Sequence, residues 1–406
     1  MTNAGRAHET GVEGLRGFAA LCVLYTHFLW ASDLDPGYEF WRGWAIFEVS
    51  QGAVLLFFIL SGYVIGLTNT RDLTPAGCRD YFRRRLLRLV PLCWLAIGLS
   101  VLVKPGDGAI PIVANLAFLQ NKIPYGDWLL PILGANTNLW TLNYEALYYV
   151  AFVLVWWRPR LWPVWLAIAV AGSIVGWLLP GNWAPMVACY SLGWIFWLAG
   201  LALARCTVRA HAPVGLPWPS MLLLWVVVWQ TKPLWALCNR LSLVPPDSPA
   251  WANYAFIDFL PASLVLMLAA SDRRPRWTLP LCYLAAGIPI LFLAWTWLRG
   301  RLEFSFQNHH LMLCILAAAL WRWRPDGVKC WSRLAWVGAI SYGLYVLQRP
   351  VQWFVHDASW LPRGNLASFG LRLALVLVLT FLLAWWAEKQ LQPWVRRRMM
   401  PASTPR

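Results

Sequence analysis

Charged residues are scarce in this sequence of 406 residues: they make up 13% of it, whereas soluble domains carry about 25%. Acidic residues are scarcer still, since 18 Asp and Glu stand against 34 Lys and Arg, a net charge of +16. Disorder is excluded, because 59% of the residues are hydrophobic. The basic charge is too diluted in an apolar chain for a nucleic-acid partner. A membrane protein with several spans and positive charge on one side remains.

Paired cysteine motifs are also absent. The nine cysteines stand singly, with no CxxC and no paired histidine spacing, which excludes a disulfide framework and a zinc site. No metal is therefore expected. The first thirteen residues are polar and include Glu9 and Glu13, unlike a cleavable signal, so the first apolar run is expected to remain as a span. We find no convincing internal repeat, low-complexity segment or soluble domain.

Long apolar runs are abundant, and each run of roughly 20 residues is enough to cross a bilayer as a helix. Many of the 31 tryptophans lie near the ends of these runs, as expected for membrane interfaces. The sequence therefore predicts an all-α polytopic integral membrane protein with about 10–12 transmembrane helices. The candidate spans are 15–32, 49–68, 87–103, 138–157, 162–179, 186–204, 220–238, 251–270, 279–298, 308–322, 334–356 and 366–387.

The basic residues predict the orientation of these spans. Most of the 34 Lys and Arg residues fall in alternate loops, and such loops face the cytoplasm. Both termini are then cytoplasmic, which requires an even number of spans. We expect residues 1–390 to form a single transmembrane domain and 391–406 a short basic cytoplasmic tail. The longest stretch between spans, 104–137, is predicted to carry a helix over residues 110–119 at the outer surface.

Ionisable side chains inside spans are few, and each is a functional candidate because burying charge in a bilayer is costly. The deep ones are His27, Glu145, Asp258 and Arg349, and those nearer span ends are Glu48, His356 and Arg372.

His27 follows Arg16 by eleven residues, which places both on one helix face about 16 Å apart along the axis. A cation at the membrane mouth and an imidazole at depth suit a long ligand with an anionic head and a reactive tip. Glu145 is predicted at a similar depth, where a carboxylate and an imidazole suit acid–base work. The alternatives are a structural histidine bonded to a neighbouring helix, or an ion pair that locks helices.

An arginine string begins the third span. On a helix Arg84, Arg85 and Arg88 share a face, and guanidinium groups so placed suit phosphates. The alternative is a purely topological role, since inner loops are basic in any case. Two small-residue turns, Ser61-Gly62 and the one that begins at Ser341, favour close helix packing.

Five strings together resemble the acyltransferase-3 family of membrane acyltransferases, which modify O-antigens, other glycans and some antibiotics. They are GLRGFAA at 14–20 with Arg16 followed by His27, FFILSGY at 57–63, RRLLRLVP at 84–91, LWTLNYEALYY at 139–149 and SYGLY at 341–345. Two positions depart from the family strings: Gln348 stands where a histidine is usual, and Leu55 where an aspartate is frequent. Glutamine can hydrogen-bond but cannot take a proton, so no acid–base role is expected at position 348. The two differences concern the acceptor more than the reaction class.

The resemblance implies acyl transfer from acyl-CoA, with acetyl-CoA as the expected co-substrate and no cofactor bound permanently. From the resemblance together with the residue patterns above, we expect the donor to dock on Arg16, Arg84, Arg85 and Arg88, with His27 as general base assisted by Glu145. The expected acceptor is a carbohydrate or lipid-linked glycan, the expected location the bacterial inner membrane, and a homo-oligomer stays open. The residues expected to line the site are Ser61, Gly62, Trp140, Asn143, Ser341, Tyr342 and Gln348.

Two other functions are open on the sequence alone. A secondary transporter of a small anion or protons would relay charge through His27, Glu145 and Asp258. A flippase or scaffold for glycan assembly would need no chemistry. The transporter is disfavoured because we find no paired, broken spans in two halves.

Overall fold

The computed structural model describes residues 3–29, 34–35, 38, 47–121, 130–178, 184–206, 208–209, 215–242, 257–271, 273–275, 277–300 and 309–399. Over these residues the regular secondary structure is helical apart from one pairing of two-residue strands, which confirms the all-α membrane class. Seven helices in the described ranges are long and apolar enough to cross a membrane, and two further apolar helices are shorter. The orientation of the termini stays a prediction.

Each of the twelve candidate spans overlaps helix in its described part. Besides the two shorter apolar helices, three helices do not meet the criterion that the seven meet. They are α1 (Asn3–Leu29), α5 (Trp140–Trp157) and α15 (Ser341–Asp357). The last two carry polar residues within the bilayer length, such as Glu145 and Gln352. These helices hold most of the candidate site, which is why hydropathy marks them weakly.

The chain divides into two compact units, which are described separately. Unit 1 comprises Met1–Ala19, Ile46–Thr70 and Val164–Gly338, and unit 2 comprises Ala20–Ala45, Arg71–Pro163 and Ala339–Arg406. The helices of unit 1 beyond the start of α1 are α2 (Ser50–Thr68), α6 (Trp162–Leu178), α7 (Ala184–Cys206), α8 (Trp218–Thr231), α9 (Pro233–Arg240), α10 (Leu260–Ala270), α11 (Thr278–Leu298), α12 (His309–Ala319), α13 (Gly327–Ser332) and α14 (Ala335–Gly338). Strands β1 (Val208–Arg209) and β2 (Arg273–Arg274) pair antiparallel.

Helices α2 and α7 of unit 1 cross closely through two glycines. A Cβ atom on Gly62 would lie 2.0 Å from the carbonyl oxygen of Trp197, and one on Gly200 would lie 2.0 Å from that of Ile59. On each helix a backbone carbonyl therefore lies directly against a glycine of the other helix. This is the packing role that small residues at helix interfaces allow in membranes.

We expect Gly62→Ala to lower stability by roughly 1–3 kcal/mol, because the added methyl group overpacks this crossing. Gly98→Ala is the matched control: a Cβ there meets nothing within 4 Å, and alanine is expected to add about 0.5–1 kcal/mol in a helix interior. Thermal unfolding of the purified chain in detergent compares the two. Equal midpoints would contradict the close crossing.

Unit 2 contains the end of α1, α3 (Pro75–Val103), α4 (Ala109–Leu116), α5, α15, α16 (Leu366–Trp386) and α17 (Gln392–Met399). Helix α3 begins earlier than predicted, because Thr74 accepts a hydrogen bond from the Gly77 amide and Pro75 occupies the first turn. The arginine string therefore lies within the helix. Helix α4 occupies the surface segment where a helix was expected.

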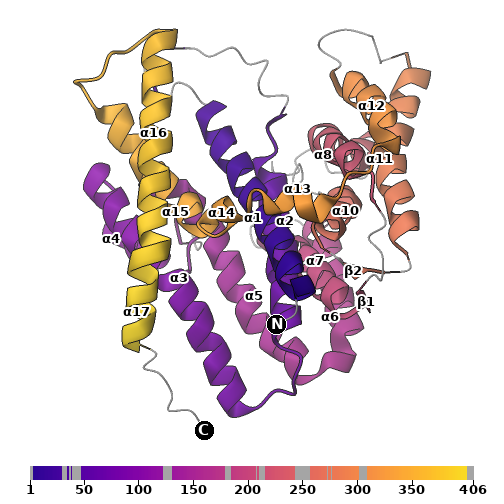
Figure 1. The fold of residues 1–406 in the computed structure, drawn as a ribbon, viewed down its shortest axis with the longest axis horizontal. Coiled ribbons are helices and arrows are strands. Elements are labelled where there is room, and N and C mark those ends of the chain that lie inside the picture. The colour runs from indigo at the N-terminus through magenta and orange to yellow at the C-terminus, as the bar shows by residue number, and fades with distance from the viewer. Residues whose placement is uncertain are drawn as a thin grey trace. The chain divides into compact units, whose positions relative to one another are not determined.

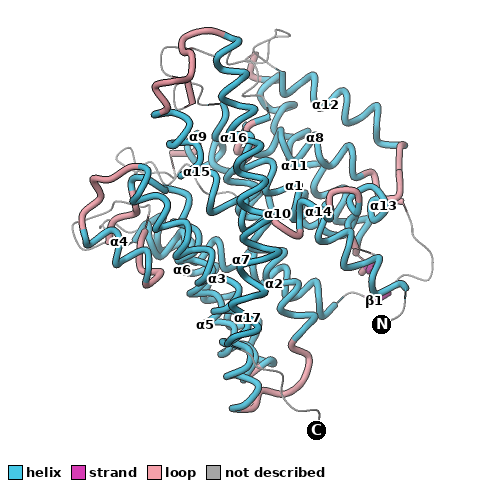
Figure 2. Tube along the Cα trace, turned by 60° about the vertical axis from the view of Figure 1, so that its left-hand side comes forward, coloured by secondary structure: helices cyan, strands magenta, loops and turns pink. Residues whose placement is uncertain are grey.

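Two prolines inside helices of unit 2 leave carbonyl groups without a helical donor, and side chains from distant segments donate hydrogen bonds to them. Proline has no amide hydrogen, so Pro91 and Pro350 leave the carbonyls four residues earlier without their helical donor. Asn136 donates to the carbonyl of Val346, 2.9 Å away, and fixes the 3₁₀ turn Gly134–Leu139 against α15. Gln392 donates to the carbonyl of Leu87 at 3.4 Å, which joins α17 to α3 (Figures 1 and 2).

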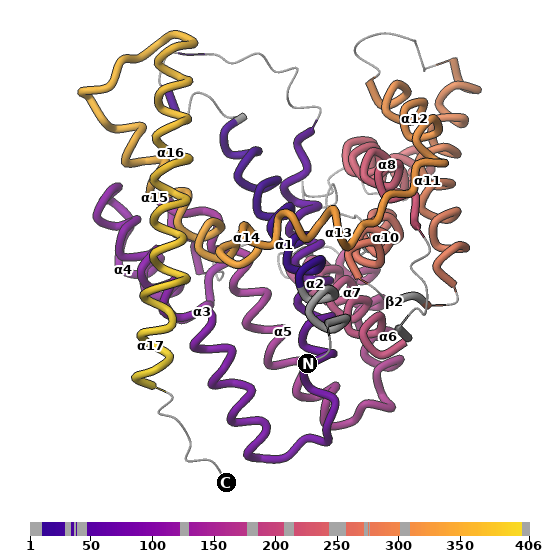
Figure 3. Tube along the Cα trace, in the orientation of Figure 1, coloured from indigo at the N-terminus to yellow at the C-terminus, as the bar shows by residue number. Residues whose placement is uncertain are grey.

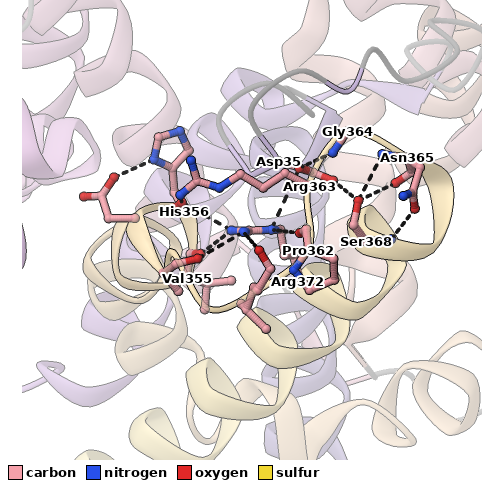
Figure 4. A network of polar contacts seen from close by, with 12 residues as sticks. Asp35, Val355, His356, Pro362, Arg363, Gly364, Asn365, Ser368 and Arg372 are labelled. Carbon is pink, nitrogen blue, oxygen red and sulfur yellow. Dashed lines mark hydrogen bonds and ion pairs between the residues drawn. The ribbon is translucent and has the colours of Figure 1, made fainter.

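The end of α15 is capped by Arg372 of α16, which is fully buried (Figure 4). Its guanidinium group donates to five carbonyls and lies 3.9 Å from the Asp35 carboxylate. Asp35 in turn accepts hydrogen bonds from the Gly364 amide and the Ser368 hydroxyl. The five carbonyls are those of Val355, His356, Ala358, Leu361 and Pro362. This ionisable residue of the sequence thus satisfies the unpaired carbonyls at a helix end.

Candidate active site

His27 lies in the last turn of α1, and its backbone is held by α15. The Gln352 side chain donates to the His27 carbonyl at 3.1 Å, and Arg349 donates to Gln352 at 2.8 Å. Gln352 is only 1% exposed, so this contact is shielded from the surroundings. From the sequence, Arg349 was identified as deep in its span, but Gln352 was not identified. Gln352 follows Gln348 by one helical turn, and this spacing could have indicated it.

Glu145 lies on α5 among tyrosines. Tyr149, one turn later, donates its hydroxyl to the carboxylate. Tyr81 of α3 donates to the Tyr149 carbonyl at 3.2 Å, and the Arg85 guanidinium lies over both rings, 5.7 Å and 5.4 Å from their centroids. Glu145 also lies within electrostatic range of Tyr345 on α15. The carboxylate is therefore linked to the arginine string through aromatic side chains.

The described contacts of His27 and of Glu145 do not include one another. Each interacts with a residue of α15. The His27 carbonyl accepts a hydrogen bond from Gln352, and Glu145 lies within electrostatic range of Tyr345. A direct meeting of the imidazole and the carboxylate therefore stays a prediction.

The lining residues expected on α5 act partly as supports. Asn143 donates to the carbonyl of Phe118 at 2.6 Å, and Trp140 packs edge-on against Tyr144 with ring centroids 5.3 Å apart. Both contacts hold the start of α5 in place. A substrate-facing role for these two residues stays a prediction.

The lining residues expected on α15 are buried. Tyr342 donates to the carbonyl of Leu89 at 2.8 Å, and Gln348 donates to the carbonyl of Tyr345 at 3.2 Å. Within the described chain, the Ser341 hydroxyl and the Gln348 side-chain oxygen are buried and have no hydrogen-bond partner. Tyr345 ties α15 to the start of α5, since its hydroxyl donates to the Asn138 carbonyl at 2.8 Å and bonds the Thr141 hydroxyl. Helix α15 therefore brings unused polar atoms into the interior of unit 2.

Arg84, Arg85 and Arg88 line one pocket of about 410 Å³, together with the C-terminal segment. Arg88 pairs with Glu388 at 2.9 Å and lies 5.5 Å from the centroid of the Tyr342 ring. The other lining residues are Leu87, Ala339, Lys389, Gln392, Pro393 and Arg396. The sequence missed the contributions of Glu388, Lys389 and Arg396, which lie about 300 residues further along the chain.

Three site candidates lie in unit 1. Arg16 pairs with Glu13 at 3.1 Å on α1. Ser61 and Gly62 lie on α2, and Gly62 forms the crossing with α7.

Two carboxylates that the sequence singled out serve as helix caps in unit 1. Asp258 accepts a hydrogen bond from the Leu234 amide at 2.9 Å, at the start of α9. Glu48 accepts from the Ser50 amide at 3.1 Å, at the start of α2, and from the Trp229 indole at 3.2 Å. First-turn amides have no partner within their helix, so these contacts explain both acids structurally.

Comparison with known proteins places the chain in a family. A family model described as "Acyltransferase domain", of the acyltransferase-3 type, matches residues 9–389. No solved structure gives a significant match.

Three relatives illustrate the similarity. The exopolysaccharide production protein ExoZ of Rhizobium meliloti is 28% identical over 198 residues, 42% of this chain and 60% of the relative. The putative peptidoglycan O-acetyltransferase YrhL of Bacillus subtilis is 26% identical over 370 residues, 84% of this chain and 48% of the relative. The acyltransferase MdmB of Streptomyces mycarofaciens is 30% identical over 184 residues, 40% of this chain and 44% of the relative. The chain thus spans about half the length of these relatives.

Proposed function

The chain belongs to the acyltransferase-3 family, and from this premise we propose that it is a membrane O-acyltransferase. It transfers an acyl group, most simply acetyl, from acyl-CoA to a hydroxyl of a cell-envelope glycan. The observation that carries the proposal is the pocket of unit 2, whose lining includes the exposed guanidinium groups of Arg84 and Arg396, because guanidinium groups suit the phosphates of such a donor. Arg85 and Arg88 also line it, and Arg88 is paired with Glu388. The names of two relatives, an exopolysaccharide production protein and a putative peptidoglycan O-acetyltransferase, support a glycan acceptor.

In the proposed reaction His27 is the general base. Its imidazole takes the proton of the acceptor hydroxyl while the hydroxyl oxygen attacks the thioester carbonyl carbon. The carbon–sulfur bond then breaks, and the sulfur leaves as a thiol with the proton that His27 returns. Glu145 orients the imidazole or the acceptor. In the alternative route His27 attacks first and carries the acyl group covalently.

Helix α15 supports a single site because residues along it interact with each part of the proposed machinery. Gln352, near its end, holds the backbone of His27. Tyr345, in its middle, lies within electrostatic range of Glu145 and bonds the Thr141 hydroxyl at the start of α5. Tyr342, in its first turn, packs beneath Arg88 of the pocket. A shift of α15 would therefore disturb donor docking and catalysis together.

The direct test uses the purified chain in lipid nanodiscs with acetyl-CoA and a glycan fragment. Mass spectrometry of the reaction follows the formation of free coenzyme A. The proposal expects acceptor-dependent release of coenzyme A. Unchanged acetyl-CoA, together with proton or anion flux into proteoliposomes that lack any donor, would instead support the transporter.

The role of the arginine pocket gives a separate prediction. We expect Arg84→Gln to raise the KM for acetyl-CoA roughly tenfold or more with little change in kcat, because a hydrogen bond between charged groups is removed. Arg83→Gln removes the same charge from the neighbouring position, which is exposed and outside the pocket lining, and should leave KM unchanged. Equal KM values for the two variants would remove the docking role of Arg84.

A further inference from the structure

The C-terminal segment departs from regular α-helix beside the arginine pocket. Helices α16 and α17 form one continuous rod, drawn in yellow in Figure 3, joined by a π-helical turn over Ala387–Leu391. Such turns are rare and frequently mark functional sites. In this turn Glu388 is buried, whereas Lys389 is exposed and lines the pocket. Of two adjacent residues in the turn, one therefore lies in the protein interior and the other is accessible from the pocket.

Glu388 holds the wall of the pocket together. One carboxylate oxygen accepts from Arg88 at 2.9 Å, and the other accepts from the amide of Gly343 at 3.1 Å. Gly343 lies in the first turn of α15, where amides have no partner within the helix and a negative charge is favourable. A single buried carboxylate thus caps α15 and fixes Arg88.

This pairing changes which cations are available to a ligand. Because the charge of Arg88 is already balanced by Glu388, its role in the pocket is architectural. Arg85 lies over the rings of Tyr81 and Tyr149. The exposed cations that line the pocket are then Arg84 of α3 and, from the C-terminal segment, Lys389 and Arg396.

Gln392 explains why the C-terminal segment lies against α3. Its amide donates to the carbonyls of Leu87 and Arg88, the first of which lost its helical donor to Pro91. Arg396 follows Gln392 by one helical turn and therefore lies on the same face of α17. The proline of the arginine string thus creates the docking point that brings Arg396 to the pocket.

We propose that Lys389 and Arg396 bind phosphate groups of the donor opposite Arg84, so that the C-terminal segment completes the pocket for the phosphorylated adenosine end of acyl-CoA. The identity of the ligand rests on the proposed function. A volume of about 410 Å³ falls within the range of small-molecule pockets, roughly 300–1,000 Å³. Arg396 lies beyond residues 9–389, the part that the family model matches. This assignment therefore comes from the contacts of this chain.

The test measures binding of coenzyme A and dephospho-coenzyme A to the full chain in nanodiscs of zwitterionic lipid, by titration calorimetry. The double variant Lys389→Gln/Arg396→Gln is expected to bind coenzyme A at least tenfold more weakly and to lose the preference for coenzyme A over its dephospho form. The control Arg397→Gln/Arg398→Gln removes two charges from the same helix, outside the pocket lining, and should bind like wild type. The swap Lys389→Arg/Arg396→Lys should retain binding.

Each contrary result has its own reading. If Arg84→Gln weakens binding while the Lys389/Arg396 double variant does not, the C-terminal assignment is overturned and the donor site of the proposed function stands. If none of these variants changes the affinity, donor docking in this pocket fails as well. Anionic lipid nanodiscs separate the remaining source of phosphate. Loss of lipid-headgroup binding in the double variant, with nucleotide affinity unchanged, would make the pocket a lipid site and overturn the proposal.

Discussion

His27→Ala is expected to lower the rate of acyl transfer roughly 10²–10⁴-fold, the usual contribution of a positioned general base, with acyl-CoA affinity nearly unchanged. The substitution removes the imidazole but keeps the backbone carbonyl, which is the group that Gln352 holds. Packing of α1 against α15 should therefore survive. Initial rates with saturating acetyl-CoA, together with coenzyme A binding by calorimetry, separate kcat from affinity.

His356→Ala is the control for this prediction. His356 also lies on α15, where it pairs with Asp357 at 2.7 Å, and its contribution to the Arg372 cap is a carbonyl that alanine retains. The acyl-transfer rate of His356→Ala should equal that of wild type. Full transfer activity in both His27→Ala and Glu145→Ala would show that the acid–base assignment is wrong.

Arg372→Leu is expected to destabilise the chain by about 3–5 kcal/mol, the usual result of removing one partner from a buried ion pair. The variant leaves the buried Asp35 carboxylate without its cation and five carbonyls without their donor. Denaturant unfolding of the purified chain in detergent measures the loss. Because α15 carries the contacts of His27, the expression of active protein should fall as well.

Two variants make this result decisive. Arg363→Leu removes an exposed guanidinium that donates to the same His356 carbonyl at 3.3 Å, and it should change stability by only about 0.5 kcal/mol. Adding Asp35→Asn to Arg372→Leu should recover part of the loss, since no uncompensated charge then remains. A stable Arg372→Leu variant would contradict the capping role that the network in Figure 4 gives this residue.

The helices of this chain could be predicted because apolar runs of bilayer length have few alternative structures. Helices α5 and α15 do not meet the length and hydropathy criterion that seven described helices meet, and polar residues such as Glu145, Gln348 and Gln352 interrupt them. These polar residues lower the mean hydropathy of the two helices, and the same residues make the helices candidates for the active site. Helix periodicity also placed Arg84, Arg85 and Arg88 on one face, and they line one pocket.

Contacts that join distant segments could not be predicted. Residues 391–406 were expected to be a short tail, because terminal basic residues follow the general charge bias of inner loops. The free carbonyl beside Pro91 and the double contact of Glu388 exist only once α3, α15 and α16 are assembled. Arg372 was a functional candidate by depth alone, and only the loop it caps shows its structural role.

The most direct test of the central claim, that the chain is an O-acyltransferase dependent on His27, is mass spectrometry of envelope glycans. Cells that lack the chain are complemented with wild type or with His27→Ala, and alkali-labile acyl esters are compared. We predict an acyl ester that is present with wild type and absent both from the deletion and from the His27→Ala strain. Identical acylation in all three strains, or full restoration by His27→Ala, would contradict the claim.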